Sequence, residues 1–343
     1  MVLRAVRRRT KAQSNARKRL RIIRPLMKIL LIKTSSLGDV IHNLPVVSDL
    51  VAHFPDAEID WVVEEGFADI PRLHPAIRRV IPVALRRWRK SLFTLETWRE
   101  LRDFGSTVRA EAYDLVIDTQ GLLKSALITR QARGRRCGFA ADSAREPVAA
   151  RFYDARFSVA KSIHAVERNR LLAAQAGGYA LTGSADYGIS RQIAQPAAPF
   201  NLSGTYAVLL TATSRDDKLW PEADWVALGR HLADQGLHCR LPAGNTTERE
   251  RAQRIAASIP GAEAMPPMSL RELAEWMGRA KLVVGVDTGL VHLAAALGRP
   301  TIALFCASDP TLTGVHAGEF AVNLGRRNQP PALAAVIAAA AFS

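Results

Sequence analysis

The segment Lys281-Leu-Val-Val-Gly-Val-Asp-Thr-Gly-Leu-Val-His-Leu-Ala-Ala-Ala-Leu297 contains the pattern that decides the fold. Its first six residues form the apolar run of a buried parallel strand, and residues 289–297 are typical of a helix. Between them, Asp287-Thr288-Gly289 would leave backbone N–H groups unpaired, with the helix dipole behind them. Such a corner suits a nucleotide diphosphate, which could belong either to a cofactor or to a leaving group.

The same alternation of apolar runs and helical patterns extends over the chain from residue 27 onward. In the first half we expect strands at 28–33, 59–63, 80–83, 114–118 and 136–139, and helices near 40–54, 91–110, 122–133 and 164–176. In the second half we expect strands at 206–210, 238–241, 281–286 and 301–305, and helices near 222–235, 247–258, 269–279, 289–297 and 332–342. The pattern predicts an α/β fold of two doubly wound, Rossmann-like domains, with parallel sheets facing each other across a cleft.

Composition divides the chain into four parts. Residues 1–26 hold ten Lys or Arg and no acidic residue, out of a net charge of +15, and we expect them to form a disordered leader. A nucleic-acid arm or an attraction to anionic lipid are the alternatives for this leader. Residues 27–177 and 206–343 are the two expected domains, and the Gly-, Ser-, Ala- and Pro-rich residues 178–205 are the expected connection.

The bulk composition excludes several classes of protein. The chain has 343 residues, of which 48% are hydrophobic and 23% charged, as in a globular protein. Its three cysteines are far apart, which argues against a disulfide or zinc framework and for a reducing compartment. No apolar stretch approaches the roughly 18 residues of a membrane span, and residues 1–26 lack the apolar core of a secretory signal. We therefore expect a cytoplasmic protein.

Two polar loops follow expected strands and are candidates for the site. Residues 33–42, Lys-Thr-Ser-Ser-Leu-Gly-Asp-Val-Ile-His, come after the first strand. There Asp39 is equally a helix cap or a general base at the mouth of the cleft. Residues 211–218, Thr-Ala-Thr-Ser-Arg-Asp-Asp-Lys, follow the first strand of the second half, and their hydroxyls and lysine could bind phosphate oxygens.

Three further features have competing explanations. Arg86-Arg87-Trp88-Arg89-Lys90 is either a solvated face or a site for acceptor carboxylates and phosphates, and Arg145 is a weaker candidate of the same kind. His292 is either a packed histidine or a group that faces a bound phosphate. An aspartic protease is discarded for Asp287-Thr288-Gly289, because the chain has one copy and a helical pattern follows it.

The absence of other motifs narrows the chemistry. No G-x-G-x-x-G follows the first strand, which disfavours a nicotinamide or flavin cofactor, and no G-x-x-x-x-G-K-[ST] is present. No Asp-x-Asp pair is available to hold a divalent metal on a sugar nucleotide. We therefore expect neither a cofactor nor a metal.

The chain resembles the lipopolysaccharide heptosyltransferases of glycosyltransferase family 9, in order from about residue 27 to about residue 325. The blocks that carry the resemblance are residues 33–42, Asp60-Trp-Val-Val-Glu-Glu-Gly-Phe67, residues 81–90, Ala144-Arg-Glu-Pro147, Arg215-Asp-Asp-Lys-Leu-Trp-Pro221 and residues 286–289. Residues 60–67 and 86–90 favour the first of these heptosyltransferases over the second or third. Ala243 stands where the resemblance leads us to expect a Trp.

The resemblance implies a GT-B fold and an inverting transfer of L-glycero-D-manno-heptose from ADP-L-glycero-β-D-manno-heptose, a substrate and not a cofactor, to the Kdo of Kdo2-lipid A. It implies a peripheral protein on the cytoplasmic face of the inner membrane, with no structural metal; we expect no nucleic-acid partner. The alternatives are a sugar-nucleotide epimerase of the same fold or a heptosyltransferase with a later core acceptor.

The resemblance also assigns roles to individual residues. Asp39 would be the catalytic base. The donor side would be formed by Thr213, Ser214, Lys218, Glu248, Met268, Asp287, Thr288, Gly289 and His292. The acceptor side would be formed by Lys33, Ser35, Ser36, Gly38 and Arg145, and we add Arg86, Arg87, Arg89 and Lys90 as a hypothesis for the acceptor's carboxylates and phosphates.

Overall fold

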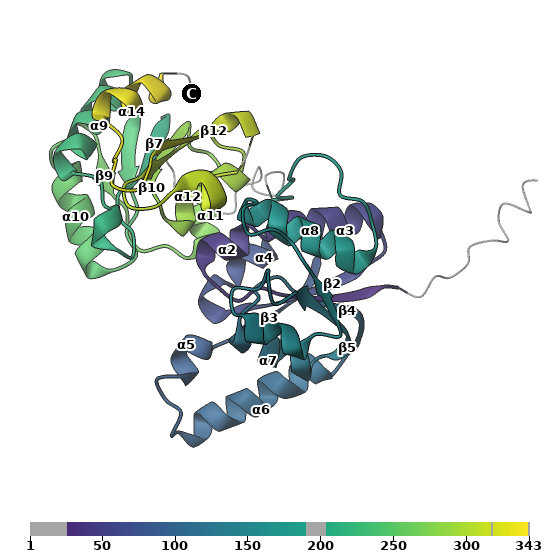
Figure 1. Cartoon of the computed structure of the whole chain (residues 1–343). Helices are drawn as coiled ribbons and strands as arrows, with labels where there is room; N and C mark the ends of the chain where they lie inside the picture. The colour runs from purple at the N-terminus through teal and green to yellow at the C-terminus, as the bar shows by residue number, and fades with distance from the viewer. Residues whose placement is uncertain (1–25, 190–203, 317, 342–343) are drawn as a thin grey trace, which may run out of the picture.

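A computed structural model describes residues 26–189, 204–316 and 318–341, which form two α/β domains joined side to side (Figure 1). The expected leader, residues 1–26, lies outside these residues except for Leu26, and so does half of the expected connection, because residues 190–203 are not described. No helix in the described ranges is long and apolar enough to cross a membrane.

The N-terminal domain is built on a parallel six-stranded sheet with the order β3-β2-β1-β4-β5-β6. Its strands are β1 (Lys28–Ile32), β2 (Glu58–Glu64), β3 (Ile77–Val83), β4 (Ala112–Asp118), β5 (Arg133–Phe139) and β6 (Ala155–Phe157). Its helices are α2 (Leu37–Ile41), α3 (Leu44–His53), α4 (Asp69–Arg72), α5 (Leu85–Trp88), α6 (Leu95–Arg109), α7 (Leu123–Gln131) and α8 (Ala165–Gly177), with short 3-10 turns η1 (Glu65–Phe67) and η2 (Pro147–Phe152).

Helices cover both faces of this sheet because the central strand is apolar on both sides. Side chains alternate along a strand, so successive residues of β1 point to opposite faces. Leu30 and Ile32 pack in the cluster that includes Phe104 of α6 and Ile128 of α7. Ile29 and Leu31 pack in the cluster that includes residues of α3 and α8. The continuous apolar run of β1 thus produces a doubly wound domain.

The C-terminal domain repeats this arrangement with the order β12-β11-β10-β7-β8-β9. Its strands are β7 (Tyr206–Leu210), β8 (His238–Leu241), β9 (Glu263–Ala264), β10 (Leu282–Val286), β11 (Thr301–Phe305) and β12 (Ala321–Gly325). Its helices are α9 (Glu222–Asp234), α10 (Thr246–Ala256), α11 (Leu270–Met277), α12 (Gly289–Ala296), α13 (Pro310–Thr313) and α14 (Leu333–Ala340), with 3-10 turns η3 (Asp216–Lys218) and η4 (Gly318–Phe320).

The two sheets have equivalent strand orders, and in each the order reverses beside the first strand, where ligands bind in doubly wound folds. The prediction of two Rossmann-like domains with parallel sheets is therefore confirmed. The single helix expected at 40–54 is wrong: α2 and α3 are separate, because Pro45 lies at the start of α3 and begins a new helix there. The short strands β6, β9 and β12 and the four-residue helices were not expected, since their apolar patterns are too short or too exposed.

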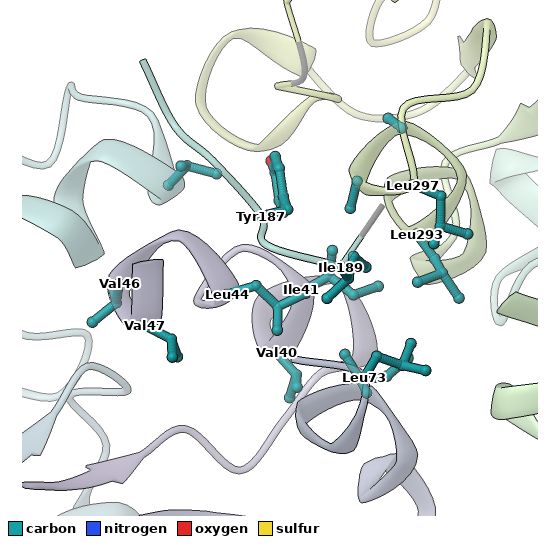
Figure 2. Close-up of a cluster of buried hydrophobic side chains, with 14 of the residues drawn as sticks. Val40, Ile41, Leu44, Val46, Val47, Leu73, Tyr187, Ile189, Leu293 and Leu297 are labelled. Carbon is teal, nitrogen blue, oxygen red and sulfur yellow. The ribbon is translucent and has the colours of Figure 1, made fainter. Parts of the chain in front are cut away.

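The domains pack together through α2 and α12, which are close to each other at their N-terminal ends. Val40 and Ile41 of α2 share one buried cluster with Leu293 of α12 and with Leu297 just after it (Figure 2). A Cβ on Gly289 would lie 2.6 Å from the Leu37 side chain, so this close approach requires glycine. The first turns of two helices from different domains therefore face one space.

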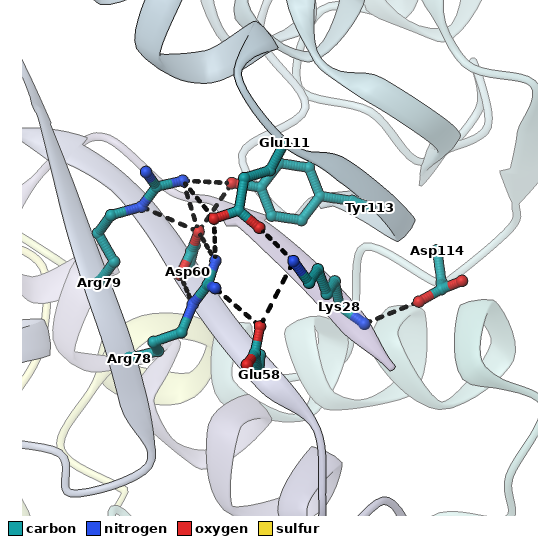
Figure 3. A network of polar contacts seen from close by, with 8 residues as sticks. All are labelled: Lys28, Glu58, Asp60, Arg78, Arg79, Glu111, Tyr113 and Asp114. Atoms are coloured by element: carbon teal, nitrogen blue, oxygen red, sulfur yellow. Dashed lines mark hydrogen bonds and ion pairs between the residues drawn. The ribbon is translucent and has the colours of Figure 1, made fainter. Parts of the chain in front are cut away.

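An ion-pair network lies at the opposite, amino end of the N-terminal sheet (Figure 3). Asp60 of β2 is fully buried and accepts hydrogen bonds from Arg78 and Arg79 of β3 at 2.7 and 2.8 Å, and from the Tyr113 hydroxyl of β4 at 2.8 Å. Lys28 of β1, Glu58 of β2 and Glu111 extend the network. Because its members come from four adjacent strands, the network joins the sheet's edge to its centre.

Candidate active site

Asp39 lies in the first turn of α2, just beyond the carboxyl end of β1. Its carboxylate Oδ2 accepts hydrogen bonds from the backbone N–H of Ser36 at 2.9 Å and from the Ser36 hydroxyl at 3.1 Å. The Arg145 guanidinium is 3.6 Å away, and the Asp39 side chain is 24% exposed. No described residue donates a hydrogen bond to Oδ1. Asp39 therefore caps its helix and also keeps one carboxylate oxygen available.

Gln120, which follows β4, holds the loop before Asp39 in place. Its side-chain oxygen accepts from the backbone N–H groups of Thr34 and Ser35 at 2.9 and 3.2 Å, and its amide nitrogen donates to the Ser35 carbonyl. The Trp61 indole donates to the Lys33 carbonyl at 3.1 Å. The position of Asp39 is thus set by contacts from β2 and β4, on either side of β1.

The C-terminal domain presents a second set of polar groups at the carboxyl ends of β7 and β10. Lys218 Nζ donates to the Asp287 carboxylate at 2.7 Å, and the Ser308 hydroxyl donates to the same oxygen. The Thr213 hydroxyl donates to the Asp287 carbonyl at 3.0 Å. Thr288 is the N-cap of α12, whose first N–H groups have no partner within the helix. The corner therefore offers a lysine and helix N–H groups to an anion, while the hydroxyl protons of Thr213 and Ser308 are already donated to Asp287.

These two sets of groups line one cavity of about 500 Å³, here called the cleft cavity. From the N-terminal domain it receives Ser36, Leu37, Gly38, Asp39, His42, Phe67, Arg86 and Arg145. From the C-terminal domain it receives Thr213, Ser214, Lys218, Asp287, Thr288, Gly289, His292, Ser308 and Thr313. The carboxylate of the first domain and the anion-binding corner of the second thus face the same space.

A neighbouring apolar pocket of about 350 Å³ lies mainly in the C-terminal domain. It is bounded by Thr213, Ser214, Thr288, Met268 and Glu248 together with aliphatic residues, and also by Ala243. Glu248 accepts from the Gly244 backbone N–H at 2.8 Å and from the Asn245 side chain at 2.8 Å, which fixes its position at the start of α10. The pocket has the size and lining for a flat heterocycle with a polar edge.

A basic pocket of about 200 Å³ lies on the other side of Asp39, mainly in the N-terminal domain. Lys33, Arg145, Lys161 and Arg168 line it, and Asp39 is its one carboxylate among the described residues. Burial lowers the pKa of Lys33, whose ammonium donates to the Thr119 carbonyl at 2.9 Å. Arg168 lies over the Phe139 ring, donates to the Ser143 carbonyl at 2.7 Å, and keeps its Nε without a partner. Such a pocket favours an anion.

His292 has features of both explanations that the sequence allows, a packed histidine and a group that faces a bound phosphate. It lines the cleft cavity but is only 6% exposed, and its Nδ1 is 3.1 Å from Nε2 of His42 across the domain boundary. Burial lowers the pKa of His292 to about 4, and burial together with the His292 ring holds the pKa of His42 well below its usual value. Both rings are therefore neutral at pH 7, and they connect α2 to α12.

The structure separates the residues of the Arg86–Lys90 run. Arg86 lines the cleft cavity and stacks over the Phe67 ring, whereas Arg87 is paired with Glu65 and Glu100. Arg89 and Lys90 are exposed and border none of the three pockets. Ser35 is buried, and its hydroxyl accepts from Lys124 at 2.9 Å. Of the residues expected on the acceptor side, Lys33, Ser36, Gly38, Arg86 and Arg145 therefore line pockets beside Asp39.

Sequence reasoning did not select Arg168, Lys161, Gln120 and Ser308, which the structure brings to these pockets. Lys161 and Ser308 are in irregular segments, and Arg168 is within a helix, where a basic residue is ordinarily solvated. Gln120 and Ser308 each follow a strand, β4 and β11, at its carboxyl end. That position is the signal that could have identified them. The described residues contain no group of three or more His, Cys, Asp or Glu placed to hold a metal ion.

Two Rossmann-like domains with a carboxylate on one side of the cleft and an anion-binding corner on the other define a GT-B glycosyltransferase. A family model described as glycosyltransferase family 9 (heptosyltransferase) matches residues 101–335. The chain belongs to this family.

Relatives and solved structures agree with this family. Lipopolysaccharide heptosyltransferase 1 of Pseudomonas aeruginosa is 49% identical over 304 residues, which cover 87% of this chain and 84% of that protein. Escherichia coli heptosyltransferase WaaC solved with ADP has a TM-score of 0.85 and 44% identity over 90% of this chain and 98% of its own. The same enzyme with ADP-2-deoxy-2-fluoro heptose has a TM-score of 0.81 and 43% identity over 92% of this chain and 98% of its own. The resemblance noted in the sequence is confirmed.

Proposed function

We propose that this protein moves L-glycero-D-manno-heptose from ADP-L-glycero-β-D-manno-heptose to the Kdo of Kdo2-lipid A, with inversion, in lipopolysaccharide inner-core synthesis. The observation that carries the proposal is the cleft cavity, which Asp39 of one domain and Lys218 and the start of α12 of the other both line. Similarity to heptosyltransferase 1 supports heptose as the sugar, and the relative solved with ADP-2-deoxy-2-fluoro heptose supports ADP-heptose as the donor.

The donor would occupy the C-terminal side of the cleft. The adenosine would lie in the apolar pocket, with Glu248 at the ribose and Met268 near the adenine. The diphosphate would lie against Lys218, the hydroxyls of Thr213 and Ser214, and the N–H groups at the start of α12. Asp287 uses one of the three N–H donors of the Lys218 ammonium, which leaves two for phosphate oxygens.

The acceptor would occupy the N-terminal side. Kdo is a sugar acid, and its carboxylate is matched by the basic pocket of Lys33, Arg145, Lys161 and Arg168. This pocket shares Asp39 with the cleft cavity, so an acceptor anchored there would place a hydroxyl near both Asp39 and the donor sugar. Holding both substrates in this geometry supplies much of the rate enhancement.

The chemical step would be a single displacement at the heptose C1. The acceptor oxygen forms a bond to C1 while its proton passes to the Asp39 carboxylate. The bond between C1 and the β-phosphate oxygen breaks, and its electron pair leaves with ADP. Lys218 and the N–H groups of α12 stabilise the charge that ADP gains. Attack from the face opposite the leaving group inverts the anomeric centre.

The proposal includes a peripheral position on the cytoplasmic face of the inner membrane, because the acceptor is a lipid. It includes no cofactor and no resident metal, and Lys218 and the N–H groups of α12 would stabilise the charge of the departing diphosphate. Epimerisation of a sugar nucleotide is not favoured by membership of a transferase family. Transfer to a later core sugar is less supported, because heptosyltransferase 1 proteins are the relatives with about half of their residues identical.

Incubation with ADP-heptose and delipidated Kdo2 acceptor tests the proposal. We expect ADP release that requires the acceptor, a product heavier by one heptose in mass spectrometry, and no loss of rate with EDTA. An acceptor that already carries one heptose is the matched control and should not be used. Conversion of the nucleotide sugar without acceptor, or preference for the heptosylated acceptor, would contradict the assignment.

A further inference from the structure

The segment between α5 and α6, together with the start of α6, carries a cluster of exposed apolar side chains. Leu92, Phe93, Leu95 and Trp98 are 44%, 103%, 77% and 60% exposed. The other exposed large hydrophobic residues among those described are at most two to a helix or loop, such as Leu123 and Leu127 of α7 and Phe320 and Val322 around the start of β12. Single exposed apolar residues are ordinary, whereas four within seven positions indicate a surface that binds something. We call these four residues the apolar tip.

Hydrogen bonds within the segment hold the apolar tip in a fixed conformation. The Ser91 hydroxyl donates to the Arg87 carbonyl at 3.1 Å, and the Thr94 hydroxyl donates to the Ser91 carbonyl at 3.0 Å. The Trp98 indole N–H donates to the Leu92 carbonyl at 2.9 Å. Because its one polar atom already has a partner inside the segment, Trp98 can enter an apolar medium without losing a hydrogen bond.

Positive charge surrounds the apolar tip. Residues 86–99 contain five Lys or Arg and a single acidic residue, Glu96. Arg89, Lys90 and Arg99 are exposed, and no described carboxylate lies within ion-pair distance of them. Apolar and aromatic side chains flanked in the chain by unpaired cations are typical of surfaces that bind anionic lipid. Trp in particular is enriched at the level of lipid headgroups.

The position of the apolar tip also favours a membrane. In Figure 1 the segment between α5 and α6 projects from the lower edge of the N-terminal domain, away from the C-terminal domain. Arg86, in the first turn of α5, lines the cleft cavity. The four-residue α5, about 6 Å long, is therefore the connection between the acceptor side of the cleft and the apolar tip.

We propose that the apolar tip inserts into the anionic surface of the membrane that holds the lipid acceptor, with Arg89, Lys90 and Arg99 at the level of the headgroups. The inference rests on the proposed function only in that the acceptor is a lipid. It goes further by naming the residues that contact the bilayer. A convex tip of four side chains suits a fluid lipid surface, which needs no complementary shape, better than a folded protein partner.

Sedimentation with lipid vesicles tests the proposal. The variant is Phe93→Ser/Leu95→Ser, which changes exposed side chains that make no side-chain hydrogen bond. The control is Phe320→Ser, which changes another exposed aromatic residue, 64% exposed, in the C-terminal domain. With vesicles of 30% phosphatidylglycerol in phosphatidylcholine, we expect the variant to partition at least tenfold more weakly than the wild type and the control to be unchanged. Pure phosphatidylcholine vesicles should bind the wild type several-fold more weakly.

Two activity measurements separate this surface from the active site. With the soluble, delipidated acceptor the variant should match the wild type, and with the acceptor embedded in vesicles its kcat/KM should fall about tenfold. Equal partitioning of variant and wild type would overturn the proposal. An equal loss with the acceptor in detergent micelles would also overturn it, because the tip would then bind the acceptor's own acyl chains. Vesicle binding that depends on the tip would support the surface even if no heptose transfer were observed.

Discussion

Asp60 and Asp39 lie at opposite ends of the N-terminal sheet, and their surroundings differ. Asp60 is completely buried and accepts hydrogen bonds from two arginines and a tyrosine (Figure 3). Asp39 is partly exposed, accepts hydrogen bonds from Ser36 and from no other described residue, and has Arg145 at 3.6 Å. The carboxylate at the amino end of the sheet is therefore enclosed by hydrogen-bond donors, whereas the carboxylate at the carboxyl end keeps one oxygen open to a ligand.

This difference follows from how parallel strands end. At the amino end, Asp60 of β2 pairs with Arg79 of β3, and a register shift between Ile59 and Asp60 leaves Arg78 beside the same carboxylate. At the carboxyl end, the strands diverge into loops and helix N-termini, where backbone N–H groups and side chains remain open to a ligand. The residues that stabilise the sheet and the residues that face the substrates thus lie at opposite ends of the strands. Substitutions at the amino end should change the free energy of unfolding, and substitutions at the carboxyl end should change the rate of the reaction.

The largest effect is expected from Asp39→Asn. The amide keeps the shape of the side chain but cannot accept the acceptor's proton, so kcat should fall about 1,000-fold, or about 4 kcal/mol in the barrier. Steady-state kinetics with the soluble acceptor measures kcat, and calorimetric titration measures ADP-heptose affinity, which should change little. Wild-type turnover in this variant would end the assignment of Asp39 as the base.

Asp60→Asn should affect stability instead. Removing the carboxylate leaves Arg78 and Arg79 without their buried partner, and because both are about one third exposed we expect a loss of about 3 kcal/mol, at the low end for a broken buried pair. Chemical denaturation measures this loss. Asp69→Asn, which breaks the exposed pair with Arg72, is the control and should cost less than about 1 kcal/mol. A loss of turnover in folded Asp60→Asn protein would contradict the separation of the two ends.

The smallest effect concerns acid stability. Burial lowers the pKa of His164, which lies beside His42 and stacks on His316, to about 4. A depressed histidine pKa adds stability that is present above the unfolded value near 6.5 and is lost as the pH falls towards 4. At the other end, hydrogen bonds from Lys28 and Arg78 lower the pKa of Glu111 to about 2, so its contribution is lost only between about pH 4.5 and 2.

Thermal unfolding at pH values from 8 to 3 measures separately the stability lost between pH 6.5 and 4 and the stability lost below pH 4.5. His164→Gln should remove about 1 kcal/mol of the loss between pH 6.5 and 4, a value reduced for partial exposure of the ring. Glu111→Gln should leave that window unchanged and alter only the lower one. If both substitutions changed the same window, the two ends would not titrate independently.

The amino-acid sequence was sufficient to predict the fold class and to identify the site residues that directly follow the strands. The apolar runs of β1 and β10 define the two sheets, and the residues just beyond them, Asp39 and Asp287, are on opposite sides of the cleft cavity. These features are local: strand, turn and helix follow one another within about fifteen residues, and hydrophobic periodicity reports them directly. The family blocks lie in the same stretches, which is why the resemblance could be recognised.

Only the tertiary structure decided which charges are available. In the sequence Arg86 and Arg87 are equivalent, but one lines the cleft and the other is paired with Glu65 and Glu100. Arg168 enters the basic pocket although it is more than 120 residues from Asp39 in the chain. Ion pairs and cavities depend on side chains that converge from distant segments, and no periodicity in a single segment records that convergence.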